Sequence, residues 1–489
     1  MSKVLPRSMM RFFKINIILS FFIAIGLFTL YSFRLTDSYF LTTDFGRDLY
    51  NIIKIAQGNL ILIGPKMNFG GYYAGPYYYY LFVPILWISR FNVDSILYFN
   101  NLLFVIASVF FFYIVSQKLT TSKAFFGMLA ISLSPLYIIC ARYPSNGYTY
   151  LPFLWILLTI VLFLKYDKKI ALVILGTFCG VIINIHPITL FVLIFIISYI
   201  FITLPRKKLI YFFLIGFIPT FLPLILFELT HNFVMTYDTF INHSYLSMLK
   251  NNSQFYPIRQ NLLINYFFIS GKLKELLTLQ PITYLVIISS IIFIEFKRKK
   301  IYSKQSNFLL ISSIISLLLL VNILRFYFEY HYIFPMAFLL LFSLTVILIR
   351  SSFWWLIGIL ILLEVIFFPT SILKIPNRSY KDLENSVKFV IDQKLITRSE
   401  PFNLIQVLDA YNLVPVGFEY RFFFRKYGFM DNSEYDYQNA KKLIIFSETP
   451  YYDIDQFKMW ATEQFGRNYF TNRQVYKLGK TTIYIISKK

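Results

Sequence analysis

The residues best suited to chemistry lie in a short acidic stretch that follows a long apolar run: Thr42-Thr43-Asp44-Phe45-Gly46-Arg47-Asp48. Asp44 and Asp48 are four positions apart, so a helix over this stretch places both carboxylates on one face. A partly desolvated aspartate can have a raised pKa and act as a general base. The alternative is an interfacial helix start in which Asp44 is the N-cap and Asp48 pairs with Arg47 or Lys54.

Glycines and tyrosines follow this stretch at high density. Gly58 and Gly64-Pro65 come first, and Gly70-Gly71-Tyr72-Tyr73-Ala74-Gly75-Pro76 then leads into four tyrosines at 77–80. Glycine lets a backbone approach a ligand closely, and tyrosine rings stack on sugars, so we expect a substrate-binding loop that includes Tyr72 and Tyr73. An interfacial aromatic belt with glycine turns is the alternative explanation of the tyrosines at 77–80.

Arginines and histidines supply further candidate binding residues. Arg142 and Arg325 are the charged residues of two short loops, and a guanidinium binds phosphate bidentately; their alternative role is snorkelling to lipid headgroups. His186 and His331 could each bind phosphate or substrate through hydrogen bonds, although a lone interfacial histidine is more often structural.

A second pair of histidines raises the question of a metal. His231 and His243 are twelve residues apart, with Glu228 and Asp238 nearby. This arrangement lacks the compact spacing of metal-ligand motifs, so we assign no metal ligand and leave a divalent cation open as a possible cofactor.

The composition requires a membrane setting for these residues. Of 489 residues, 57% are hydrophobic and 15% are charged, whereas a soluble domain has about 25% charged residues. The net charge of +23 is concentrated before Pro369, where 29 Lys and Arg face 11 Asp and Glu. These cations lie in short loops between apolar segments, where they orient the chain against acidic lipids, and nucleic acid is not an expected partner. Cys140 and Cys179 lie in apolar segments and are expected to be core residues.

We expect eleven transmembrane helices, with a cytoplasmic N-terminus and an external C-terminus, because this arrangement puts the basic loops inside. The Tyr77–Ser89 segment is short and contains Pro84, so we expect it to lie at the outer interface. Loop 34–95 and all four histidines then fall on the outer side. The expected apolar segments are 15–33, 96–116, 124–140, 148–164, 170–186, 188–204, 209–229, 281–296, 308–324, 331–349 and 352–369.

The composition changes after Pro369, which predicts a membrane module over 1–369 and a small external α/β domain over 370–489. Apolar spacing predicts a helix over Ser379–Lys394. We expect strands over Phe402–Leu408, Lys442–Phe446 and Thr481–Ile486, with a hairpin turn at Leu478-Gly-Lys before the last one.

The order of motifs resembles the GT-C glycosyltransferases that use polyprenyl-phosphate sugars. These motifs are the first helix, the external Asp-x-x-Arg-Asp, the Gly-Pro pairs and the tyrosine run. Among these enzymes, the sequence resembles the dolichyl-phosphate-mannose–protein mannosyltransferases and the aminoarabinose transferases of lipid A. The similarity continues at Ser134-Pro135, Arg142-Tyr143-Pro144-Ser145-Asn146, His186-Pro187 and Tyr330-His331-Tyr332 with Pro335.

The resemblance implies a multispanning GT-C fold and an enzyme of the outer face of a bacterial cytoplasmic membrane. Its substrates would be a polyprenyl-phosphate sugar and a lipid, glycan or protein acceptor. It implies that Asp44 takes the acceptor's proton or orients the acceptor, with Asp48 or Arg47 in support. The sequence departs from these relatives at Phe45, where they often have a second acid, at Gly75, where the lipid A transferases have a lysine, and at Asn146, near which they carry an aspartate. The expected substrate-binding residues are Arg47, Tyr72, Tyr73, Arg142, Asn146, His186, Arg325 and His331.

Two other functions remain open on the sequence. An O-antigen-type polymerase or ligase also spans the membrane many times, but it predicts neither the acidic motif after the first helix nor the external C-terminal domain. A lipid-linked-glycan transporter would carry charged or broken helices at mid-membrane, where Glu364 is the main candidate. A membrane anchor for the terminal domain is weaker, because one helix would suffice.

Overall fold

A computed structural model describes residues 7–67, 71–166, 168–242, 262–298, 304–323, 330–408, 416–449, 454 and 459–488. The chain forms two compact units. The first consists of Met1–Leu35, Ile61–Leu81 and Ile96–Leu373, and the second of Thr36–Leu60, Phe82–Ser95 and Lys374–Lys489.

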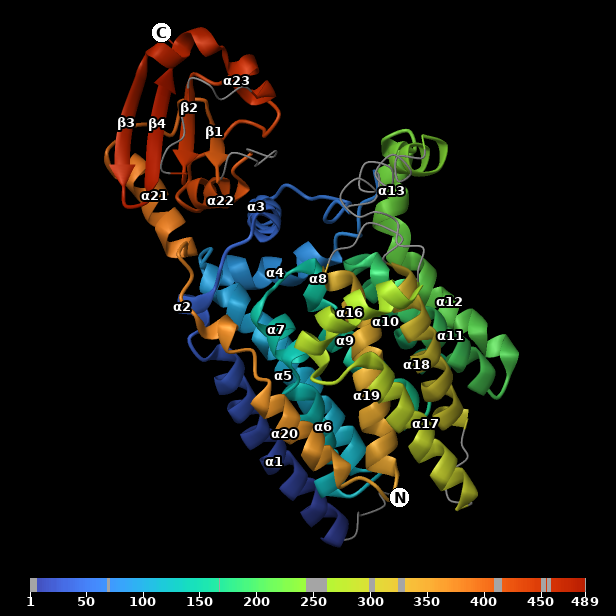
Figure 1. Cartoon of the computed structure of the whole chain (residues 1–489). Helices are drawn as coiled ribbons and strands as arrows, with labels where there is room; N and C mark the ends of the chain where they lie inside the picture. Colours follow the sequence, from blue (N-terminus) through green and yellow to red (C-terminus); the bar gives the residue numbers. More distant parts are fainter. Residues whose placement is uncertain are drawn as a thin grey trace. The chain divides into compact units, whose positions relative to one another are not determined.

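The first unit is helical, and its central helix is α19, which is buried from Phe334 to Ile349 and packs against α6, α17 and α18 (Figure 1). Its helices, some shared with the second unit at their ends, are α1 (Arg7–Ser32), α4 (Tyr77–Ile88), α5 (Val93–Ser116), α6 (Thr121–Ser132), α7 (Pro135–Arg142), α8 (Asn146–Thr149), α9 (Leu151–Phe163), α10 (Lys169–Ile185), η1 (Pro187–Thr189), α11 (Leu190–Thr203), η2 (Lys207–Leu209), α12 (Ile210–Phe217), η3 (Ile218–Phe221), α13 (Leu222–Thr230), α14 (Val234–Thr236), η4 (Tyr237–Ile241), α16 (Leu262–Leu277), α17 (Pro281–Lys297), α18 (Lys304–Ile323), η5 (Tyr330–Ile333), α19 (Phe334–Arg350), α20 (Leu356–Ile366) and η6 (Thr370–Leu373).

The length and apolarity of these helices make the chain a multi-pass membrane protein. Within the described ranges, five helices are long and apolar enough to cross a bilayer: Asn16–Ser38, Val93–Ser116, Asn146–Phe163, Lys207–Thr230 and His331–Arg350. Two bent pairs would raise the number to seven, and five shorter apolar helices accompany them. Each of the eleven expected apolar segments overlaps a helix, but the number that cross remains a prediction, as does the interfacial position of the 12-residue helix α4.

The two bends have local causes. Between α6 and α7 the axis turns by 64°, where Ser134 caps α7 by accepting a hydrogen bond from the N–H of Tyr137 and Pro135 occupies its first turn. Between α16 and α17 it turns by 75°, where Thr278 has a φ of 62° and Pro281 begins α17. Proline at the first turn of a helix cannot continue the preceding one, so both breaks are fixed by sequence.

The second unit contains a four-stranded sheet in the order β1-β2-β4-β3. Strand β1 pairs with β2 in parallel, and β4 pairs antiparallel with both β2 and β3. The strands are β1 (Phe402–Val407), β2 (Lys442–Ser447), β3 (Arg473–Leu478) and β4 (Thr481–Ser487); the helices of this unit are α2 (Leu35–Ser38), α3 (Thr43–Ala56), α21 (Tyr380–Asp392), α22 (Phe418–Lys426), α23 (Trp460–Phe465) and η8 (Arg467–Thr471).

The structure has each secondary-structure element expected near the C-terminus. Helix α21 begins after Ser379, whose hydroxyl accepts the Asp382 N–H while the Asp382 carboxylate accepts the Ser379 N–H, a reciprocal cap. Leu478 pairs with Thr481 across a two-residue turn, in which Gly479 has a φ of 58°. The turn was expected, but no sequence pattern predicted β3, which forms the first arm of this hairpin, or the helices α22 and α23.

Candidate functional site

The expected acidic stretch begins the helix α3 (Thr43–Ala56), and its N-cap is Thr42 rather than Asp44. Thr42 is the N-cap of α3, where its hydroxyl accepts the N–H of Phe45 at 3.2 Å. Asp44 stands in the first turn and Asp48 one turn later. The first two turns of α3 therefore carry two carboxylates, and Arg47 lies between them in the sequence.

Arg47 joins the two carboxylates. Its Nη1 donates to Asp44 Oδ1 and its Nη2 to Asp48 Oδ1, each at 2.9 Å. The two acids differ in exposure, because the Asp44 side chain is 78% exposed and that of Asp48 is 1% exposed. Asp44 is consequently the carboxylate that an external molecule can reach, while Asp48 holds Arg47 from the buried side.

The predicted glycine-tyrosine loop is a hairpin of the first unit. Lys66 pairs antiparallel with Tyr73, and the Gly64 N–H donates to the Ala74 carbonyl at 2.7 Å. A Cβ on Gly64 would collide with the Gly75 carbonyl, so glycine is required for this close approach. The pairing of 64–67 with 72–74 therefore brings Tyr72, Tyr73 and the exposed Lys66 close together.

The hairpin tyrosines are neutral hydrogen-bonding groups. Burial raises the pKa of Tyr72. Burial also raises the pKa of Tyr73, and the nearby carboxylate of Asp238 adds to this effect. Both hydroxyls therefore keep their protons near neutral pH and can donate to an oxygen-rich ligand.

Two expected binding residues, His186 and His331, come together in the first unit. Their ring centroids are 5.1 Å apart, and Tyr332 lies 6.0 Å from the His186 ring. The Nδ1 of His186 accepts the N–H of Ile188 at 3.3 Å, so a neutral ring carries its proton on Nε2. Asn146 begins α8, and Gly147 of that helix lies directly against the His331 ring. His186 and His331 thus lie together, and Asn146 directly precedes the glycine that contacts His331.

Arg142 has a different environment from the one expected of a phosphate ligand. Its guanidinium is buried and donates to three backbone carbonyls, those of Tyr31 at 2.8 Å, Phe33 at 2.9 Å and Ile372 at 3.3 Å. This arrangement ties the end of α1 to η6. The phosphate-binding role of Arg142 remains a prediction, and Arg325 lies outside the described residues.

The histidine-acid group considered for a metal is not assembled by the described residues. The Glu228 carboxylate accepts the N–H groups of Met235 and Thr236, both at 2.9 Å. His231 stacks on Phe227 with ring centroids 4.1 Å apart. His243 lies outside the described residues, and among those that are described no three His, Cys, Asp or Glu side chains converge as metal ligands. Cys140 and Cys179 are buried thiols, as expected.

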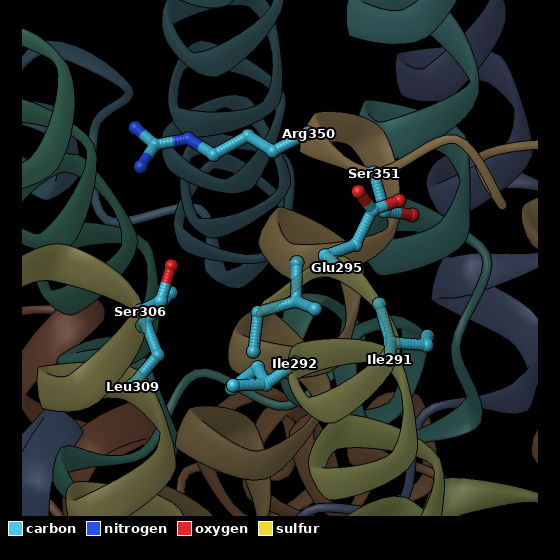
Figure 2. Close-up of a pocket in the computed structure, with 8 residues that line it drawn as sticks. Ile291, Ile292, Glu295, Ser306, Leu309, Arg350 and Ser351 are labelled. Carbon is cyan, nitrogen blue, oxygen red and sulfur yellow. The ribbon is translucent and has the colours of Figure 1, made fainter. Parts of the chain in front are cut away.

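A small cavity lies at the end of α19 opposite His331. Its volume is ≈ 20 Å³, and Figure 2 shows Arg350 extending away from Glu295 within it. Glu295 accepts hydrogen bonds from the N–H and the hydroxyl of Ser352, and Arg350 bonds to Gln305 and the Leu162 carbonyl. The two charged residues that line the cavity thus already have protein partners, and none of the expected site residues lines it. It is lined by Ile291, Ile292, Glu295, Ser306, Leu309, Ile347, Arg350 and Ser351.

Two residues that no sequence pattern indicated lie beside the glycine-tyrosine hairpin and the start of α3. Lys66 is opposite Tyr73 on the hairpin, and Glu419 of α22 lies against Gly46 of α3. The Gly64-Pro65 and Gly75-Pro76 pairs could have indicated the hairpin and hence Lys66. No local signal links Glu419 to Gly46, because the two residues are more than 370 positions apart.

Comparison with known proteins identifies the fold. No protein-family model matches the sequence, and no curated protein shows a significant match. Among solved structures, ArnT from Cupriavidus metallidurans bound to undecaprenyl phosphate aligns with 96% of this chain and 97% of its own, with a TM-score of 0.55 and 11% identity.

Two further structures align more loosely. The same ArnT in its apo state gives a TM-score of 0.43 at 11% identity, with the same 96% and 97% coverage. The Archaeoglobus fulgidus oligosaccharyltransferase complex with Zn and sulfate gives 0.47 at 13% identity, over 88% of this chain and 67% of that one. The likeness to undecaprenyl-phosphate-bound ArnT extends over nearly the whole of both chains, and the fold class expected from the sequence is confirmed: the chain has a GT-C-type membrane fold with a small C-terminal α/β domain.

Proposed function

We propose that this chain is an integral-membrane glycosyltransferase of the outer face of a bacterial cytoplasmic membrane. It would move a sugar from a polyprenyl-phosphate donor to a hydroxyl of a lipid, glycan or protein. The main support is the fold shared over 96% of the chain with an ArnT structure that is bound to undecaprenyl phosphate. The exposed carboxylate at the start of α3 supplies the chemical group that such a transfer needs.

The proposed reaction needs one base. The acceptor oxygen attacks C1 of the sugar, the bond between C1 and the phosphate oxygen breaks, and the acceptor proton passes to Asp44. Asp44 suits this role because Arg47 binds only its Oδ1, and no described residue donates a hydrogen bond to Oδ2. Arg47 also holds the carboxylate in place, which favours an oriented acceptor.

The departing lipid phosphate needs positive charge or hydrogen-bond donors. Arg47 is occupied by two carboxylates and Arg142 by carbonyl groups. Lys66 is exposed, and no ion pair to it occurs among the described residues, so we assign it this role together with Nε2–H of His186.

Donor turnover tests the proposal. Membranes that contain the wild type, Asp44→Asn or Asp37→Asn receive a panel of polyprenyl-phosphate sugars and an envelope extract as acceptor, and free polyprenyl phosphate is measured by mass spectrometry. Asp37 is the matched control, because it lies on α2 and forms an exposed pair with Lys381 at 3.0 Å. We expect release by the wild type and Asp37→Asn, and a loss of about 10²–10⁴-fold in Asp44→Asn.

Other outcomes would redirect the proposal. Equal release by wild type and Asp44→Asn would keep the enzyme class and reject Asp44 as the base. No release by folded wild type from any donor would reject the transferase and favour the polymerase or transporter alternatives.

A further inference from the structure

Arg378, close to the start of the C-terminal part of the second unit, is bound on several sides by buried groups. Its Nη1 donates to the Leu41 carbonyl at 2.9 Å, and its Nη2 pairs with Glu419 at 2.7 Å. Its Nε pairs with Glu448, the residue after β2. The Arg378 side chain is 14% exposed, and that of Glu419 is fully buried. One guanidinium therefore connects residue 41 to α22 and to the end of β2.

The Leu41 carbonyl is well placed to control the start of α3. Leu41 directly precedes Thr42, which forms both contacts that begin the helix: its hydroxyl accepts the Phe45 N–H at 3.2 Å and its carbonyl accepts the Gly46 N–H at 2.8 Å. Asp44 lies between these residues. A shift of the Leu41 carbonyl would therefore move the turn that carries Asp44.

Glu419 packs against the same turn, beside Gly46. A Cβ on Gly46 would collide with the Glu419 side chain and lie 3.0 Å from its Cα and backbone N. The space beside Gly46 is thus filled by the residue that pairs with Arg378. Arg378 therefore fixes the turn both through the Leu41 carbonyl and through Glu419.

The charges of this cluster depend on one another. Burial raises the pKa of Glu419, while Arg378 opposes this shift. Burial disfavours the charged form of Arg378, but the carboxylates of Glu419 and Glu448 outweigh that effect and raise its pKa. Removal of the guanidinium would leave two close carboxylates without their cation, so the cluster would rearrange rather than stay in place.

A separate contact holds the middle of α3. The Tyr50 hydroxyl donates to Asp431 at 3.0 Å, and the Arg425 guanidinium lies 4.9 Å from the Tyr50 ring. Tyr50 also packs against Phe418, with ring centroids 5.6 Å apart. Because these contacts do not involve Arg378, its replacement would release the start of α3 while the middle of the helix stays docked.

We infer that Arg378 is a positioning residue for Asp44, which it holds through the Leu41 carbonyl and Glu419. The inference deepens the proposed function and rests on it for its kinetic part. It assigns the C-terminal segment an indirect part in the transfer step, because its residues position Asp44 and none of them is proposed to touch substrate.

Hydrogen exchange and kinetics on the full chain in lipid nanodiscs test this inference. The variants are Arg378→Gln, the conservative Arg378→Lys, and Arg398→Gln as a matched control on an exposed arginine of the same unit. In Arg378→Gln we expect the amides of residues 45–48 to exchange at least about tenfold faster, while those of 50–55 change little. We expect kcat to fall about 10–100-fold with KM for the donor nearly unchanged, because the base is misplaced and binding is not. Arg378→Lys should recover part of both effects, and Arg398→Gln should match the wild type.

Unchanged exchange at 45–48, or unchanged kcat, in folded Arg378→Gln would overturn the inference. If Arg378→Gln does not fold, Arg378→Lys decides instead, because a lysine keeps the positive charge but cannot bind the Leu41 carbonyl, Glu419 and Glu448 at once; faster exchange at 45–48 supports the inference and wild-type exchange overturns it. If the wild type releases no lipid phosphate, the proposed function fails on its own. The exchange of 45–48 still shows in that case whether Arg378 holds the turn.

Discussion

At the scale of single residues, identical side chains in one helix have different roles because their burial differs. Asp44 and Asp48 share Arg47, yet one is 78% exposed and the other 1% exposed. The exposed acid can meet an acceptor, while the buried acid fixes the arginine. Arg142, the residue expected to bind phosphate, instead binds three backbone carbonyls.

Replacement of Asp48 by asparagine should destabilise the protein more than replacement of Asp37. The buried carboxylate of Asp48 accepts two hydrogen bonds from Arg47, at 2.9 and 3.1 Å. We expect Asp48→Asn to cost about 1–3 kcal/mol in the free energy of unfolding, and Asp37→Asn, in an exposed pair, less than about 1 kcal/mol. Thermal unfolding of the two purified variants measures the difference, and equal midpoints would contradict it.

The contacts of Arg142 lead to a second prediction. Arg142→Met leaves the carbonyls of Tyr31, Phe33 and Ile372 without this donor, which should cost about 2–4 kcal/mol and lower the yield of folded protein. Size-exclusion chromatography and thermal unfolding measure this loss. A variant that folds like the wild type but has a raised KM for the lipid donor would instead support the phosphate-binding role.

At the scale of elements, close helix packing in the first unit depends on small residues. Gly176 of α10 faces α12, Gly216 of α12 faces α10, and Gly180 of α10 faces Thr220 of η3. A Cβ on Gly176 would collide with the Phe213 carbonyl, and one on Gly216 with the Val173 carbonyl. Helices in lipid gain little from the hydrophobic effect between them, so this close backbone contact carries much of their association.

Gly176→Leu should therefore separate α10 from α12. We expect a loss of at least about 1–3 kcal/mol, because the added side chain meets backbone that cannot move aside without shifting a helix. Gly26→Leu is the matched control, since no atom lies within 4 Å of the Cβ position at Gly26 of α1. Comparable thermal unfolding of both variants would show that the two helices tolerate separation.

In the second unit, an ion pair links α21 to α22 and makes their association depend on pH. Lys426 pairs with Glu384 at 2.7 Å and the Tyr427 hydroxyl also donates to Glu384. Burial would raise the pKa of Glu384, but these contacts outweigh it, and the pKa is lowered below 4.5. A lowered folded-state pKa stabilises the fold above the unfolded-state pKa, and this stabilisation is lost as the pH falls through the folded-state value.

Glu384→Gln should therefore lower stability by about 1 kcal/mol at pH 7, and the difference from wild type should shrink as the pH falls below about 4.5. Thermal unfolding of the full chain as a function of pH measures it. Glu463→Gln is the control, because its pair with Arg467 is 3.5 Å long and Glu463 is 59% exposed. A difference that grows at low pH would contradict the sign of the shift.

At the scale of the whole molecule, topology decides which residues can meet an external substrate. The excess of basic residues in one set of loops predicts a cytoplasmic N-terminus and an external C-terminal domain. The native thiols Cys140 and Cys179 are buried and should not react with an impermeant maleimide. Labelling of a variant with one added cysteine therefore reports on the added position alone.

Labelling of intact cells tests this topology. We expect Gln464→Cys, on the exposed surface of α23, to be labelled before lysis, and Lys118→Cys, in a basic loop, only after lysis. The unmodified chain serves as the control for native thiols. The opposite pattern would place the acidic stretch on the cytoplasmic side and reject an outer-face transferase.

The sequence by itself determined the membrane class and the apolar segments that form helices, and through its resemblance to known enzymes it indicated the GT-C-type fold. The helical segments are local features: apolar length sets a membrane helix, and Ser379 with Asp382 caps α21. The hairpin before β4 likewise follows from Leu478-Gly-Lys alone.

Only the tertiary structure decided how these local features are used. The exposure of Asp44 and the burial of Asp48, the grouping of residues 36–60 with 374–489, and the contact of Arg378 with Leu41 all join positions far apart in sequence. Periodicity shows that a helix has a buried face, but it does not show which distant residue fills the space beside a glycine such as Gly46. That choice depends on packing, because burial and the partners of a charge are set by every element that closes around it.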